Sequence, residues 1–329
     1  MGPLKSDLCS LPALLAFSIW TAQMGSLSGG YMRYYVELVL YEDGAQQHPL
    51  PELQSKYVYY TEVATAVSRR LALLGAGQFK VSIKGIYTLT PAQTSAVFLK
   101  NGRLVSVDDV YKRLMSLLRK HCKANVHQKD FAVLVTRRQL VTNYGVPTNG
   151  FTLRGSMCTG QNIAIVKDDG AFDMVNHFLK ALLYAFGVDL DGNGFARKCP
   201  SSGGFLMGTG KLNIPFSFSY CTKAQITAVL RRLVCIRGKM KNKTSKSLPM
   251  PRKIGRTDYC QAIGAVNCDD DGMETIEHLG IEKTACQVFC CTPPRSMKTI
   301  AAPDGLDCSN DLTGLLDMRC LNGMCKQLR

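Results

Sequence analysis

Residues 180–194 read K-A-L-L-Y-A-F-G-V-D-L-D-G-N-G, and this stretch decides between two architectures. Its second half spaces Asp189 and Asp191 like the oxygen ligands of a calcium-binding EF-hand loop. Such a loop closes with a bidentate glutamate at its twelfth position, and counting from Asp189 that position holds Pro200. The sequence therefore predicts a helix that ends at Gly187, followed by a polar turn and no EF-hand.

Strand-like and helix-like segments alternate on both sides of this helix. Strands are indicated where β-branched and aromatic residues alternate or run together, and helices where apolar residues recur every three or four positions. Alternation of this kind is typical of an α/β layer structure. We predict strands over residues 34–41, 79–89, 131–136 and 163–167, and helices over residues 53–74, 107–121, 172–186 and 223–233.

The N-terminus carries Lys5, an apolar run over residues 11–20 and small residues around Gly25. This pattern is typical of a secretory signal peptide and is too short to span a bilayer. We predict a signal peptide over residues 1–28 and hence a secreted, extracellular protein without a membrane span. A nucleic-acid partner is not expected for such a protein.

The sequence contains 14 cysteines, and eight of them lie between Cys260 and Cys325. In a secreted chain this density predicts a disulfide-stapled module, here residues 258–329. A zinc-binding module would need repeated C-x-x-C pairs, which the sequence lacks. Cys122 is predicted to be the unpaired thiol. Four further cysteines are expected to form two disulfides among themselves: Cys158, Cys199, Cys221 and Cys235.

Ten Lys and Arg residues and no acidic residue lie between positions 231 and 256, within a net charge of +15. We predict a basic linker over residues 239–257, with an N-glycosylation sequon at Asn242. One interpretation is a solvated spacer, and the other is a site for polyanions such as heparan sulfate. The residues of that site would be Arg237, Lys239, Lys241, Lys243, Lys246, Arg252 and Lys253.

Several segments carry motifs beyond periodicity. They are Y-V-E-L-V-L-Y at 35–41, F-A-V-L-V-T at 131–136, G-S-M-C-T-G-Q-N-I-A-I-V-K-D-D at 155–169, and G-F-L-M-G-T-G at 204–210. In this order they resemble the first strand, third strand, edge strand and Met-turn of the adamalysin (reprolysin) branch of the metzincin zinc metalloproteases, found in snake venom and tick saliva. The resemblance implies a metzincin-like mixed sheet with helices over residues 29–238, followed by a cysteine-rich module.

The same family has the zinc motif H-E-x-x-H-x-x-G-x-x-H-D, which aligns with the opening stretch. Two histidines one helical turn apart and a third after the glycine would hold zinc, and the glutamate would act as general base. Gly187 and the turn methionine Met207 match the pattern. The three histidine positions and the glutamate position hold other residues: Lys180, Tyr184 and Leu190, and Ala181, respectively.

These replacements predict that the zinc chemistry is lost. An ammonium occupies one ligand position, leucine has no lone pair, and alanine cannot accept a proton. Four other histidines, at 48, 121, 127 and 177, lie in the metzincin-like part, but their positions do not reproduce the ligand spacing.

The resemblance implies a secreted pseudoprotease that acts by binding and has no cofactor. Its partner would be an extracellular protein, by family analogy one of host haemostasis or the matrix, or heparan sulfate. The alternative is an active secreted zinc metalloendopeptidase whose ligands are not recognisable, with zinc as its cofactor. A gene copy without a selected role is a third hypothesis.

Overall fold

The fold is seen in a computed structural model of the chain, which describes residues 32–44, 55–98, 104–121, 130–210, 212, 216–238, 248–268, 286–292, 296–309 and 317–328. The predicted signal peptide, His48, Cys122 and His127 lie outside these residues. In the described part of the chain, no helix combines the length and the apolar character needed to cross a membrane.

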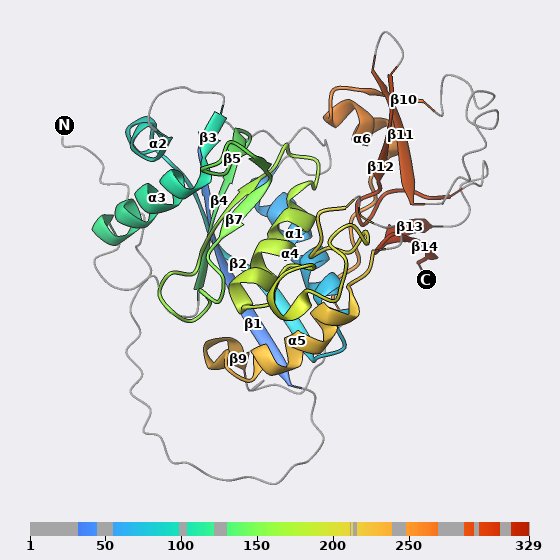
Figure 1. Ribbon diagram of the computed structural model, residues 1–329. Coiled ribbons are helices and arrows are strands. Elements are labelled where there is room, and N and C mark those ends of the chain that lie inside the picture. Colours follow the sequence, from blue (N-terminus) through green and yellow to red (C-terminus); the bar gives the residue numbers. More distant parts are fainter. Residues whose placement is uncertain are drawn as a thin grey trace.

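A twisted sheet forms the centre of the larger lobe (Figure 1). Its strand order is β2-β1-β4-β8-β7. The strands are β1 (Arg33–Glu42), β2 (Gln78–Thr88), β4 (Asp130–Thr136), β8 (Ile163–Lys167) and β7 (Gly150–Thr152), and the short β9 (Arg237–Gly238) pairs with the start of β1. All pairings along this path are parallel except that of β7 with β8.

The predicted edge strand is not at the edge. Residues 163–167 form β8, which pairs with β4 on one side and with β7 on the other. The first four of its five residues are buried, as expected of a continuous apolar run covered on both faces of a sheet. The edge is instead β7, which is only three residues long and antiparallel.

Helices cover both faces of the sheet, and the side chains of β4 alternate between two cores. Phe131, Val133 and Val135 pack with α1 (Lys56–Ala72) and α4 (Met174–Phe186). Ala132 and Leu134 pack with α3 (Val107–His121). The predicted α/β layer structure is confirmed.

Two helices differ from the expectation. The helix predicted over residues 223–233 is α5 (Tyr220–Leu230), which begins earlier because the Ser219 hydroxyl caps it by accepting from Thr222 N–H at 3.1 Å. The unpredicted helix α2 (Pro91–Phe98) begins with a reciprocal pair, in which Thr90 and Gln93 each accept a backbone N–H from the other. This capping box and the proline in the first turn are signals that the sequence carried.

Short strands and turns complete the larger lobe. β3 (Leu104–Ser106), β5 (Gln139–Val141) and β6 (Pro147–Thr148) form a small separate sheet, with β5 in the middle. The 3-10 helices η2 (Gly194–Ala196) and η3 (Val234–Ile236) flank α5 in the sequence. Two disulfides, Cys158–Cys235 and Cys199–Cys221, connect these segments to the rest of the lobe.

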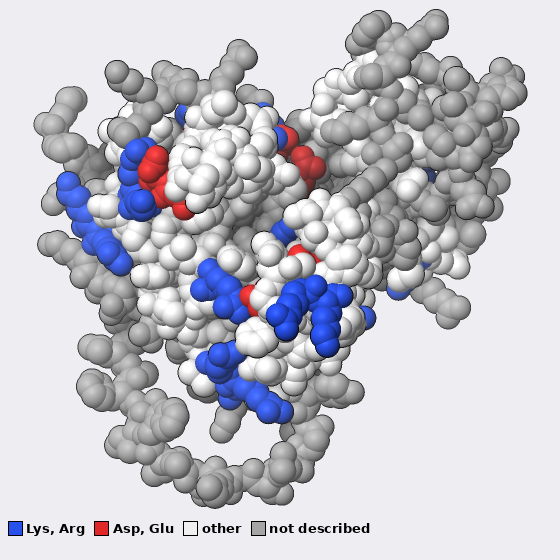
Figure 2. Space-filling view, in the orientation of Figure 1, with Lys and Arg blue, Asp and Glu red and all other residues white. Residues whose placement is uncertain are grey.

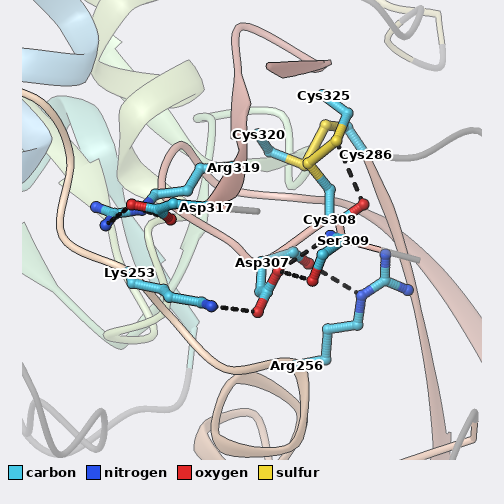
Figure 3. Close-up of a disulfide and its surroundings, with 10 residues drawn as sticks. All are labelled: Lys253, Arg256, Cys286, Asp307, Cys308, Ser309, Asp317, Arg319, Cys320 and Cys325. Atoms are coloured by element: carbon cyan, nitrogen blue, oxygen red, sulfur yellow. Dashed lines mark hydrogen bonds and ion pairs between the residues drawn. A yellow bond between two sulfur atoms is a disulfide. The ribbon is translucent and has the colours of Figure 1, made fainter. Parts of the chain in front are cut away.

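The C-terminal region is small and rich in disulfides, as predicted. It contains α6 (Arg256–Ala262), a sheet of β10 (Val266–Asn267), β11 (Gln287–Thr292) and β12 (Ser296–Ala301), and a hairpin of β13 (Met318–Leu321) and β14 (Met324–Gln327). Its disulfides are Cys260–Cys290, Cys268–Cys291, Cys286–Cys320 and Cys308–Cys325. The last two lie side by side, as Figure 3 shows.

Candidate ligand-binding cleft

A cleft of about 870 Å³ opens between α4, β7 with its preceding loop, and the segment after Met207. Four of the positions that the sequence aligns with the metzincin motif line it: Lys180, Ala181, Tyr184 and Leu190. His177, one turn earlier on α4, lines it as well. The structure therefore brings these positions together on one wall, as the helical spacing in the sequence predicts.

The other two positions aligned with the motif, Gly187 and Met207, lie next to this wall but do not line the cleft. Gly187 ends α4 in the left-handed conformation, with φ of 106°, and its N–H bonds to the carbonyls of Leu183 and Tyr184. A glycine adopts this conformation without strain, which explains its place in the pattern. Met207 is fully buried, and its carbonyl accepts from Asp191 N–H at 3.0 Å.

Lys180 is held in place by the loop opposite α4. Its ammonium donates to the carbonyl of Gly208. A side chain at position 208 would clash, because a Cβ there would lie 2.3 Å from the carbonyl oxygen of Ser201. Burial lowers the pKa of Lys180, and the nearby carboxylate of Asp191 partly opposes that shift.

The acidic side chains of the opening stretch are directed at protein groups. Asp191 accepts from the Ser219 hydroxyl at 2.7 Å, and burial raises its pKa. Asp189 accepts from Phe195 N–H at 2.8 Å and pairs with Arg154 at 2.6 Å. These contacts stabilise the turn after α4, so the two carboxylates do not form a common cation site.

The zinc ion of the metzincin motif does not fit the side chains present. An ammonium, a phenol and an isobutyl group stand where three imidazoles would be needed. The motif also lacks a general base, because Ala181 is 5% exposed and apolar. Within the described residues, one group of potential ligands lies close enough to hold a metal, namely Cys286, Cys308 and Cys320, and all three are in disulfides.

His177, on α4, is a further titratable group that lines the cleft. Burial, followed by the charges of Lys167 and Lys180, lowers its pKa to about 4. It is therefore neutral at physiological pH. His121 ends α3, on the opposite face of the sheet from α4.

The edge strand β7 offers backbone groups to the cleft, which the sequence did not reveal because three residues give no periodicity. Asn149 C=O accepts from Lys167 N–H at 2.9 Å. Every second residue of an antiparallel pair bonds to its partner strand, so the backbone N–H and C=O of Phe151 also point toward β8. Thr152, the next residue of β7, is buried and lines the cleft, and by the same alternation its N–H and C=O point away from β8. The corresponding groups of Gly150 are bonded to the Thr148 hydroxyl.

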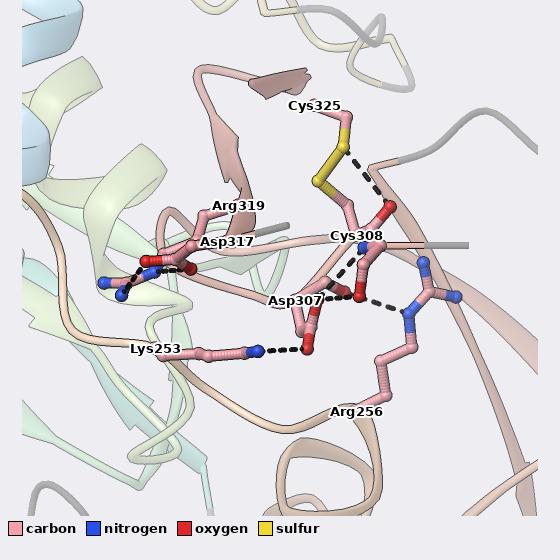
Figure 4. Close-up of polar contacts among 8 residues, drawn as sticks. Lys253, Arg256, Asp307, Cys308, Asp317, Arg319 and Cys325 are labelled. Atoms are coloured by element: carbon pink, nitrogen blue, oxygen red, sulfur yellow. Dashed lines mark hydrogen bonds and ion pairs between the residues drawn. A yellow bond between two sulfur atoms is a disulfide. The ribbon is translucent and has the colours of Figure 1, made fainter. Parts of the chain in front are cut away.

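The described residues of the predicted polyanion site, Arg237, Arg252 and Lys253, contact different partners. Arg237 donates to the carbonyls of Leu230 and Arg231 at the end of α5. Lys253 pairs with Asp307 at 2.7 Å, as Figure 4 shows, and Arg252 lies 3.9 Å from Glu62. The positive charges of Arg252 and Lys253 are thus offset by carboxylates. Outside the described residues lie Lys239, Lys241, Asn242, Lys243 and Lys246.

Further polar contacts join the linker to the C-terminal region (Figure 4). Arg319 holds Asp317 through two hydrogen bonds of 2.8 and 2.6 Å, and it also donates to the carbonyl of Pro251. Arg256 donates to the carbonyl of Asp307 at 3.0 Å. Residues 251–256 are therefore a docked segment rather than a free spacer.

Comparison with known proteins gives no family for the chain. No protein-family model matches it, and no curated protein matches it. Among solved structures, it is similar to a chain of a chaperone–substrate complex (TM-score 0.40, 10% identity, covering 63% of this chain and 36% of that one). It is also similar to metalloproteinase-II from Bacteroides fragilis (TM-score 0.41, 14% identity, covering 60% of this chain and 53% of that one).

Proposed function

We propose that this chain is a secreted, catalytically inactive metalloprotease homologue, and that its cleft holds an extended segment of an extracellular protein. The observation that carries the proposal is the cleft itself, whose wall bears Lys180, Ala181, Tyr184 and Leu190 where catalysis would need zinc ligands and a base. Binding remains available to a site that has lost its chemistry, because the walls persist.

The chemistry of the walls suits a polypeptide. Thr152 presents a backbone donor and acceptor at the edge of the sheet, to which an extended segment can add as a further strand. Phe151, Tyr184 and Leu190 supply apolar and aromatic surface for alternate side chains. The ammonium of Lys180 lies on the same wall and favours a segment with an acidic residue.

The first experiment measures metal and cleavage together. We expect the purified protein to hold no stoichiometric zinc, its melting temperature to be unchanged by EDTA, and a broad peptide library to remain uncleaved. One tightly held zinc per chain together with EDTA-sensitive cleavage would instead support the alternative, an active zinc endopeptidase.

The second experiment tests the cleft as a binding site. Peptides are selected from a random displayed library on the wild-type protein, and their Kd is measured on two variants. Thr209 is exposed and lines the cleft, so Thr209→Trp should raise Kd about tenfold or more by occupying the space that a peptide needs. Ser202 is exposed outside the cleft, and Ser202→Trp is the matched control. Equal Kd values for both variants would place the binding site elsewhere.

A further inference from the structure

Exposed cations gather at one end of the larger lobe, on α5 and the segments that flank it. Figure 2 shows Lys and Arg side chains over the part of this face where α5 and β9 lie, with few acidic side chains among them. The exposed members are Arg197, Lys198, Lys223, Arg231, Arg232 and Arg237, and we call this set the basic face.

One disulfide and one hydrogen bond bring residues of the basic face together from separate segments. The disulfide Cys199–Cys221, with Cα atoms 6.2 Å apart, places Arg197 and Lys198 beside the first turn of α5, where Lys223 lies. At the other end of the helix, Arg237 donates to the carbonyl of Arg231. The basic face is therefore a rigid feature of the fold.

The cations follow the helix axis rather than forming a compact cluster. Lys223 and Arg231 are eight positions apart, which corresponds to about 12 Å along an α-helix. Ala224, Thr227 and Ala228 are exposed between them. Their side chains are small, so no bulky group projects from the helix surface between the two cationic ends. A linear ligand can lie along such a strip and meet positive charge at both ends.

The described residues around the basic face supply no carboxylate partner to its cations. Within the described ranges, no ion pair joins any of its six side chains to a carboxylate. Lys253 and Arg252 of the linker differ in this respect, because Asp307 and Glu62 lie beside them. Arginine and lysine side chains free of such partners attract sulfate and carboxylate groups.

We propose that the basic face binds a linear sulfated polysaccharide of the glycosaminoglycan type, laid along α5. This site is separate from the cleft and does not depend on the function proposed for it. It also differs from the linker site expected from the sequence, since five of its six residues are not among those predicted.

The test compares three variants of the full-length protein for retention on immobilised heparin and for Kd at 0.15 M salt. In the face variant, Lys198, Lys223, Arg231 and Arg232 are each changed to Gln. In the control variant, the exposed Lys80, Lys112, Arg119 and Lys120 of β2 and α3 are changed to Gln, which removes the same charge from another surface. In the linker variant, Lys239, Lys241, Lys243 and Lys246 are changed to Gln.

We expect the face variant to elute at lower salt and to bind heparin about tenfold more weakly, because four exposed ion pairs are lost together. The other two variants should elute close to wild type. Equal losses in the face and control variants would mean that net charge alone governs retention, and a loss confined to the linker variant would place the site there. Either result overturns the proposal. Binding to phosphatidylserine vesicles without binding to heparin would also overturn the proposal. Three apolar or aromatic side chains that could contact a membrane are exposed on the same segments: Phe195, Tyr220 and Val234.

Discussion

His177 is a half-buried titratable group in the cleft, and its protonation state is set by burial and by neighbouring charges. It lies one helical turn before Lys180, and Lys167 is near enough to contribute to its pKa. Burial is the largest cause of the lowered pKa, because the charged imidazolium loses solvation inside the protein. Burial also lowers the pKa of Lys180. His177 therefore adds no positive charge to the wall of the cleft at physiological pH.

A pH dependence of stability follows for His177. Its pKa falls from 6.5 in the unfolded chain to about 4 in the fold, so the unfolded state binds more protons between these values. The free energy of unfolding should therefore decrease by up to about 3 kcal/mol as the pH falls from 7 to 4. Urea denaturation across this range should show a shallower decrease in His177→Gln. Parallel curves for variant and wild type would mean that the pKa of His177 is not lowered.

At the level of elements, the end of α4 determines where the chain enters the turn that carries Asp189 and Asp191. Gly187 has φ of 106°, and a Cβ there would lie 3.8 Å from Gly155 Cα, an ordinary contact. Space is available, so the restriction on this position is conformational. After the turn, Asp191 bonds to Met207 C=O and Ser219, which ties α4 to the start of α5.

Gly187→Ala should lower the free energy of unfolding by about 1–2 kcal/mol, the cost of placing a Cβ in the left-handed conformation. Gly187→Asn should cost less, because asparagine tolerates this conformation better than alanine. Urea denaturation of both variants measures the difference. If alanine is as stable as glycine, the helix does not end in the conformation described.

At the level of the whole molecule, two regions depend on different interactions. The larger lobe has a continuous hydrophobic core on each face of its sheet. Of the six disulfides among the described residues, four lie in the small C-terminal region. This region also contacts the larger lobe through Arg69 and Asp304 at 3.2 Å. A region this small buries too little apolar surface for stability without cross-links.

Graded reduction should therefore unfold the C-terminal region before the larger lobe. Removing native disulfides from a small domain typically costs about 2–5 kcal/mol each, which exceeds what such a region can lose. Limited proteolysis after treatment with increasing dithiothreitol, followed by mass spectrometry, should show cleavage within residues 258–329 first. A protease-resistant C-terminal fragment that persists after full reduction would contradict this expectation.

The local elements could be predicted from the sequence because their signals are local. The buried faces of α1, α3 and α4 follow from apolar residues at helical spacing. β1 follows from alternation, and β4 follows from a continuous apolar run. The place of Lys180, Ala181 and Tyr184 on one wall follows from the same periodicity. α2 was also accessible through its capping box at Thr90 and Gln93, although its short length obscured it.

Contacts between distant segments were decided only by the tertiary structure, since nothing near them in the sequence specifies the partner. The edge position belongs to β7 because β8 is covered on both sides. Lys180 bonds to Gly208 C=O across the cleft, and Lys253 pairs with Asp307, 54 positions away in the sequence. The basic face exists because a disulfide joins the segment after η2 to α5. The pairing of cysteines depends on which segments the fold brings within bonding distance.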